Sequence, residues 1–65
     1  MKVTYSPDVD VLRIRLNQSV IAESDEEKPG IILDYDADGN IVGLEILDAS
    51  KRVEDPRHFE IAVSA

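Results

Sequence analysis

The chain has 65 residues, with 14 acidic and 7 basic side chains, a formal net charge of −7 and no cysteine. Disulfide bridges and thiolate metal sites are therefore excluded, because both need cysteine sulfur. No apolar run is long enough to span a bilayer or to form a signal-peptide core. We expect residues 1–65 to form one small cytoplasmic domain without a membrane association. A domain of this size buries only about 60% of its unfolded surface, so its core should be thin.

The acidic residues are concentrated in the middle of the chain. Residues 23–48 contain nine acids and one base, a net charge of −8, whereas residues 1–22 sum to +1 and residues 49–65 to zero. This middle stretch would repel a phosphate backbone, and no cluster of Lys and Arg offsets it. Direct nucleic-acid binding is therefore not expected.

Alternating apolar and polar residues predict an antiparallel hairpin at the start of the chain. The runs 1–6 and 12–16 both alternate with period two, which is typical of half-buried strands. Pairing the two runs sets Tyr5 opposite Leu12 and every other apolar residue opposite an apolar one. The pairing is self-consistent, because opposed residues share one face of a sheet.

A second hairpin is predicted around Asp38-Gly39, a dipeptide suited to a type I′ turn. The expected register opposes apolar residues throughout: Ile31 with Ile46, Leu33 with Leu44, and Tyr35 with Val42. A slip of one residue would set Leu33 against Glu45, so the apolar pattern selects this register.

The remaining segments complete a mainly β prediction. Residues 20–27 favour an acidic edge strand. Asp48 can cap a short helix near residues 49–54 that ends before Pro56, and residues 59–63 alternate like a last strand. We therefore expect an antiparallel meander of about five to six short strands with one short helix, α+β at most.

The segment from Asp34 to Glu45 matches the spacing of a calcium-binding loop, with Asp34, Asp36, Asp38 and Gly39 in the specified positions. A true EF-hand needs a helix on each side, but both flanks alternate like strands. The register also places Glu45 about 13 Å along its strand from the turn. A polar hairpin turn is favoured, and weak divalent-ion binding by the three aspartates is the alternative.

Other candidate sites are weaker. His58 is the only histidine, and the spacing brings no serine or orienting carboxylate to it, so a surface histidine is favoured over a general base. Arg13 and Arg15 project from one side of a strand and could bind an anion, but cross-strand ion pairs with neighbouring acids are favoured. We expect no catalytic residue and no cofactor.

Four segments, in order, resemble the small prokaryotic family catalogued as domain of unknown function 2283. They are residues 1–5, 10–16, 29–36 and 39–50. The most specific stretch is Gly43-Leu44-Glu45-Ile46-Leu47-Asp48-Ala49-Ser50, and the resemblance covers about residues 1–54. It implies a stand-alone cytoplasmic protein, often encoded beside a small basic toxin-like protein, and it carries over no catalytic residue.

Together these observations predict a non-enzymatic, acidic protein-binding module. A thin core favours a homo-oligomer, a dimer, and the acidic middle stretch favours a small basic protein as partner. The family resemblance suggests an antitoxin-like role toward that partner. The alternative is a weak divalent-ion or small-ligand binding protein that uses the turn formed by Asp34, Asp36 and Asp38.

Overall fold

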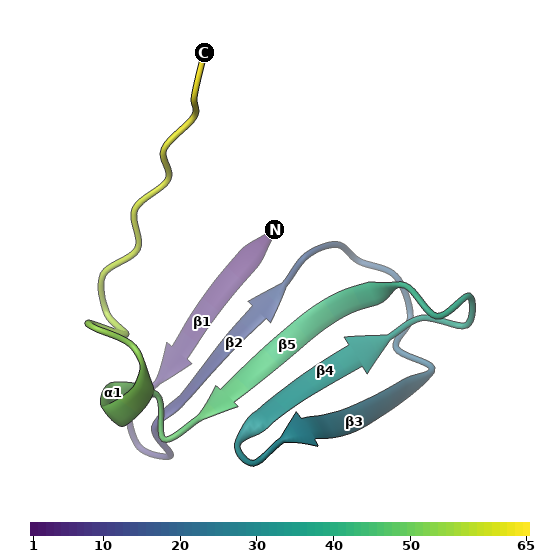
Figure 1. Ribbon diagram of the computed structural model, residues 1–65, viewed down its shortest axis with the longest axis horizontal. Coiled ribbons are helices and arrows are strands. Elements are labelled where there is room, and N and C mark those ends of the chain that lie inside the picture. The colour runs from purple at the N-terminus through teal and green to yellow at the C-terminus, as the bar shows by residue number, and fades with distance from the viewer.

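A computed structural model describes residues 1–65 as one antiparallel sheet of five strands with one short helix (Figure 1). The mainly β prediction is confirmed. The elements are β1 (Lys2–Ser6), β2 (Val11–Arg15), β3 (Glu23–Lys28), β4 (Ile31–Tyr35), β5 (Ile41–Leu47) and α1 (Ala49–Arg52).

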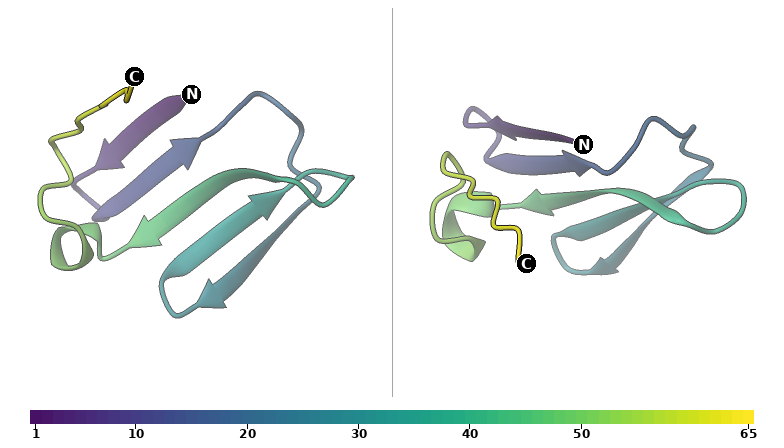
Figure 2. Two further views of the ribbon diagram at one scale, coloured as in Figure 1. Left: turned by 45° about the horizontal axis from the view of Figure 1, so that its top comes forward. Right: turned by 90° about the horizontal axis from the view of Figure 1, so that it is seen from above.

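The strand order is β1-β2-β5-β4-β3, which corrects the expected meander. β2 pairs with β5 instead of β3, and the loop of residues 16–22 runs past the ends of β5 and β4 to reach β3 (Figures 1 and 2). The physical reason is burial. β5 is the longest strand and contains fully buried Val42, so it takes the centre, whereas every residue of β3 is exposed and β3 takes an edge.

The predicted register of the first hairpin is confirmed, with Val3 opposite Ile14 and Tyr5 opposite Leu12. In the second hairpin, the predicted pairs Ile31 with Ile46 and Leu33 with Leu44 are also confirmed. Tyr35 lies opposite Ile41 instead of Val42, because the register shifts between Asp34 and Tyr35. A bulge of this kind adds one residue to one strand only, and side-chain alternation gives no sign of it.

Three element boundaries differ from prediction. The strand expected over residues 20–27 begins at Glu23, and the helix ends at Arg52, before Pro56 is reached. Asp48 has φ 53° and makes no side-chain capping bond. Residues 59–63 form no strand, and the tail projects beyond β1 (Figure 1). The outer edge of β1 is open, but the tail does not pair with it, and an alternating pattern alone does not determine a pairing partner.

The molecule is one sheet thick, with extents of 35 × 32 × 18 Å. Val42 and Ala49 are the only hydrophobic residues that are fully buried. Most other apolar side chains of the sheet are half-buried and gather on one face, whereas Arg13, Arg15, Asp34 and Glu45 lie on the opposite face. The single helix spans four residues, and no helix has the length and apolar character needed to cross a membrane.

Tight packing around Gly43, on central strand β5, can be tested by adding a side chain there. A Cβ there would lie 2.9 Å from Asp34 Oδ2 and 3.2 Å from the carbonyl oxygen of Ile14. We expect Gly43→Ala to lower the free energy of unfolding by about 1–3 kcal/mol, because a methyl group would overpack a buried strand. Urea denaturation measures the change, and Glu45→Ala on the same strand is the control, expected to lose about 1 kcal/mol or less. Equal effects of the two substitutions would contradict the crowding at Gly43.

Candidate functional site

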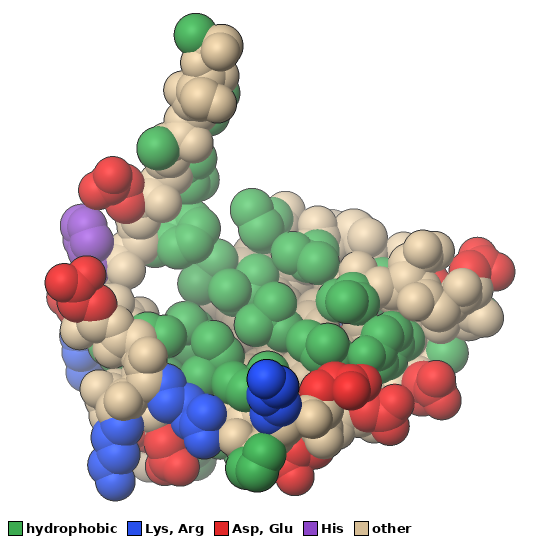
Figure 3. Space-filling view, viewed as in Figure 1, with side chains coloured by type: hydrophobic (Ala, Val, Ile, Leu, Met, Phe, Trp, Pro, Cys, Tyr) green, Lys and Arg blue, Asp and Glu red, His purple; other side chains and the backbone are tan.

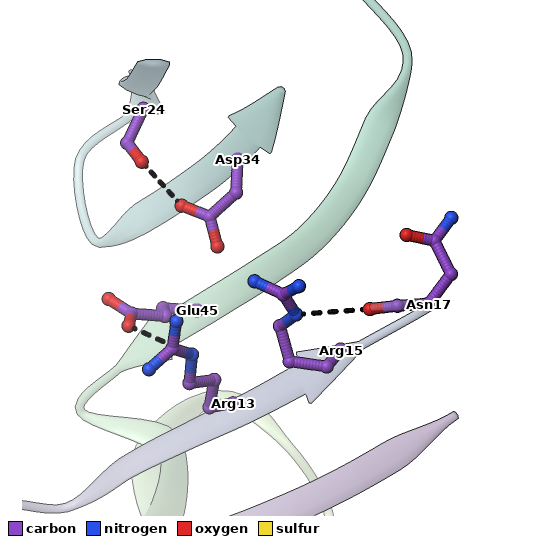
Figure 4. Close-up of polar contacts among 6 residues, drawn as sticks. All are labelled: Arg13, Arg15, Asn17, Ser24, Asp34 and Glu45. Atoms are coloured by element: carbon purple, nitrogen blue, oxygen red, sulfur yellow. Dashed lines mark hydrogen bonds and ion pairs between the residues drawn. The ribbon is translucent and has the colours of Figure 1, made fainter. Parts of the chain in front are cut away.

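Asp34, on β4, is a buried carboxylate on the polar face of the sheet. It is 4% exposed, and its Oδ1 accepts a 2.6 Å hydrogen bond from the Ser24 hydroxyl of β3. Figure 4 shows the two side chains pointing toward one another across the strand pair. Oδ2 has no hydrogen-bond partner and lies over Gly43, where the missing side chain leaves room for it. The carboxylate therefore ties the edge strand to the middle of the sheet.

Arg13 and Arg15 project from the same polar face but have different partners (Figure 4). Arg13 Nε lies 3.5 Å from Glu45 Oε1, so the predicted cross-strand ion pair is confirmed for this residue. Arg15 forms no ion pair. It donates instead to the main-chain carbonyls of Asn17 at 3.2 Å and Ser19 at 2.8 Å, because the loop after β2 presents these acceptors. Both guanidinium groups are thus engaged within the chain.

The candidate ion ligands Asp34, Asp36 and Asp38 do not converge. Asp34 points toward Ser24. Asp36 Oδ1 accepts the backbone N–H groups of Asn40 and Asp38 at 2.9 and 3.0 Å, and these bonds, Asn40 first, lower the pKa of Asp36. No group of three or more His, Cys, Asp or Glu side chains lies close enough together to hold a metal ion. Asp36 therefore shapes the hairpin turn, as the side chain of an Asx turn does, while Asp34 belongs to the β3–β4 contact.

Asp10 joins the first hairpin to the helix. Its Oδ1 accepts hydrogen bonds from the Tyr5 hydroxyl at 2.8 Å and the Ser50 N–H at 2.9 Å, and its Oδ2 accepts the Ser50 hydroxyl at 2.6 Å. Its carbonyl accepts the Ala49 N–H at 2.9 Å. The bonds from Ser50 and Tyr5 lower the pKa of Asp10, and the same contact raises the pKa of Tyr5. The C-terminal end of β5 is thereby fixed to the β1–β2 turn.

An acidic border, made of Glu23, Asp25 and Glu27, runs along β3. The register sets Glu23 opposite Tyr35 and Asp25 opposite Leu33, so both lie on the apolar side of the sheet. Glu27 Oε1 accepts the Tyr35 hydroxyl at 2.7 Å. This bond, reinforced by burial and by the negative charge of all three acids, raises the pKa of Tyr35 to about 12. Negative charge is therefore concentrated at this edge.

The apolar face covers the side of the sheet from which the acidic border rises. Its central residues are Val3, Leu12, Ile14, Leu33, Leu44 and Ile46, all half-buried. Figure 3 shows a continuous hydrophobic area over β1, β2, β5 and β4, with acidic side chains along the β3 side. The sheet therefore presents an apolar face that no other element covers fully.

A groove crosses the apolar face where the chain returns from α1. Residues 53–56, 58 and 59 and the face side chains of β1, β2 and β5 enclose about 340 Å³. The Arg57 guanidinium lies 5.6 Å from the centre of the Tyr5 ring. A positive charge therefore lies beside β1, at one side of the groove. His58 lies at the rim of the groove, and its backbone N–H donates to the Asp55 carbonyl.

The chain is similar to a family of known proteins. A family model described as "Protein of unknown function (DUF2283)" matches residues 2–50 of the chain. The chain belongs to this family. No curated protein and no solved structure matches it. The residues matched by DUF2283 include all five strands and the Asp10–Ser50 junction, so the family pattern describes the sheet and its closure on the helix.

Sequence reasoning did not single out Ser24 or the junction between Asp10 and Ser50. The partners are 10 residues apart in the Ser24 pair and 40 residues apart in the Asp10 pair. Short-range spacing cannot bring such partners together. Only an indirect signal for Asp10 was visible in the sequence, which is that it ends a tight turn. Aspartate tolerates a positive φ better than most residues, and Asp10 adopts a φ of 56°.

The lowered pKa of Asp10 predicts an acid dependence of stability. A depressed native pKa adds stability above the unfolded value, near 3.8, and this stability is lost as pH falls through the native value. Asp10→Asn keeps the acceptor oxygen and the tolerance of positive φ but removes the charge. We expect a lower urea midpoint at neutral pH and a shallower loss of stability below pH 3.8. Asp36 leaves a residual acid dependence. An unchanged acid profile would contradict the role of Asp10.

The ion-binding alternative predicts a different response. Since the three aspartates are not assembled around a common point, we expect the same melting temperature in millimolar calcium and in chelator. Asp38→Asn serves as the control, because its side chain makes no hydrogen bond within the turn. A calcium-dependent rise in melting temperature that Asp38→Asn removes would support ion binding instead.

Proposed function

We propose that this protein is a non-enzymatic, acidic protein-binding module that presents edge strand β3 to a basic protein partner in the cytoplasm. The proposal rests on the exposed and unpaired edge of β3. It pairs with β4 on one side only, and all six of its residues are exposed. An exposed edge offers unpaired N–H and C=O groups to an added strand.

The charge on β3 selects the chemistry of that partner. Four of the six residues are acids and one is Lys28. Pairing with a second β3 would bring like charges together, which is destabilising. A strand or patch rich in Lys and Arg would complement the acidic border and would be steered toward it at low ionic strength.

Two further features support a binding role over a catalytic one. The polar face engages its charged groups internally, through Asp34 with Ser24 and Arg13 with Glu45. The groove on the other face is lined mainly by hydrophobic side chains. With the family's implied gene neighbour, these features favour an antitoxin-like module that masks a basic toxin-like protein.

The partner test uses a neutralised border, Glu23→Gln, Asp25→Asn and Glu27→Gln together. These changes preserve shape, and the amide oxygen that replaces the Glu27 carboxylate can still accept the Tyr35 hydroxyl bond. We expect a captured basic protein to bind roughly tenfold more weakly at low salt, because three surface ion pairs contribute about 0.2–1 kcal/mol each. Affinity capture followed by titration calorimetry measures the difference.

The matched control neutralises three exposed acids away from β3: Asp8→Asn, Asp38→Asn and Glu60→Gln. It carries the same net charge as the neutralised border and should retain wild-type affinity. If the captured partner is a nuclease, its inhibition should follow the same ranking. Equal weakening by the two sets, or binding only to acidic proteins, would refute a β3 site.

A further inference from the structure

The apolar face has no second layer within residues 1–65. Antiparallel sheets commonly expose one face to water and pack the other against a core. Here the apolar face is uncovered, and Val42 of β5 and Ala49 of α1 are the only hydrophobic residues that are fully buried. Stable domains bury the apolar face of a sheet against another layer. We therefore expect the apolar face to be covered by a layer from outside residues 1–65.

We propose that this occupant is a second copy of the chain, in a two-fold dimer whose sheets pack face to face and exchange their C-terminal tails. Residues 59–63 of each protomer then lie along the groove of the other. The proposal goes beyond the binding function of β3, because it uses the apolar face of the sheet and leaves the unpaired backbone edge of β3 free.

The dimensions of the face fit a dimer. The whole chain, with its projecting tail, extends over 35 by 32 Å along its two long axes. A standard stable interface buries about 800 Å² on each partner, which the apolar face and the exchanged tail together can supply. Packed sheets lie about 10 Å apart, so a second copy would supply the missing layer directly.

The tail has the pattern of a strand, but it pairs with neither open edge of its own sheet, β1 or β3. Phe59, Ile61 and Val63 alternate with Glu60 and Ala62. Ile61 is 71% exposed and Val63 is 90% exposed, so neither contributes to the fold of its own chain. Phe59 lines the rim of the groove, and the tail leaves the groove at this point. Exchange between two copies would place each tail against apolar surface without changing the sheet.

Charge distribution selects one of the two simple arrangements. A two-fold axis across the strands would stack the acidic border of one copy on that of the other. An axis parallel to the strands instead places each acidic border over the β1 side of its partner. That side carries Arg57 above Tyr5, and residues 49–65 are neutral overall. The parallel axis avoids like-charge contact and brings Arg57 toward the acid-rich β3 of the other protomer.

The test measures mass by light scattering after gel filtration and dimer affinity by analytical ultracentrifugation, at micromolar concentration. We expect a dimer for the wild type. Ile61→Asp with Val63→Asp should weaken it roughly tenfold or more, because two apolar anchors are replaced by charges. Both positions are exposed in the protomer, so its folding is preserved. Val20→Asp is the matched control, an equally exposed valine in the β2–β3 loop, 84% exposed, that should leave affinity unchanged.

The orientation of the two copies can be tested by reversing the charges of two residues that the parallel axis brings together. Arg57→Glu should weaken the dimer, and adding Glu27→Arg should restore part of the loss. A wild-type monomer would overturn the proposal and leave the face to another protein. A wild-type dimer indifferent to the tail variant, or weakened equally by Val20→Asp, would also overturn it. Tail variants leave β3 intact, so these outcomes are independent of the partner test.

Discussion

The structure depends on one constraint: five strands form a single sheet, and a single sheet encloses almost no interior. Of 30 backbone hydrogen bonds, 21 lie within helices and strands, so the ladders are well formed. Apolar burial is the weak component, with two hydrophobic residues fully buried and the rest of the apolar face half-covered. Because burial of apolar area is the dominant favourable contribution to folding, such a sheet gains most from whatever covers that face.

Polar contacts on either side of β5 compensate for part of the thin core. Ser24 and Asp34 hold the edge strand through a short hydrogen bond, and Gly43 leaves the space in which that carboxylate lies. At the other end, Asp10 receives the hydroxyl and N–H of Ser50. Gly43 and Ser50 both belong to the stretch by which the family was recognised. Their contacts here are structural, since Gly43 leaves room for the Asp34 carboxylate and the Ser50 hydroxyl donates to Asp10.

The alternation of apolar and polar residues predicted those features of the fold that depend on residues close together in the chain. Alternation over residues 1–6 and 12–16 was sufficient for the first register, because a slip would have turned every apolar side chain to the wrong face. The pairing of β2 with β5 was missed, since it joins segments far apart in the chain and no turn sequence encodes it. The bulge before Tyr35 and the contact between Asp10 and Ser50 were missed because alternation and short-range spacing carry no sign of either. For the candidate site, the acidic character of residues 23–27 was visible in sequence, but their place at an open edge followed only from the strand order.

The two edges and the apolar face impose different modes of association. An open edge that pairs with its own kind extends without limit, whereas a two-fold contact through a face closes after two copies. β3 carries acids and a register shift between Glu26 and Lys28, both of which oppose pairing between copies. β1, with five residues, is the other open edge of the sheet. In the proposed dimer the two chains associate through the apolar face, while the unpaired backbone edge of β3 stays open to a chain of opposite charge. A dimer built in this way would present two such edges, one from each protomer, so a basic partner could be bound at two equivalent places.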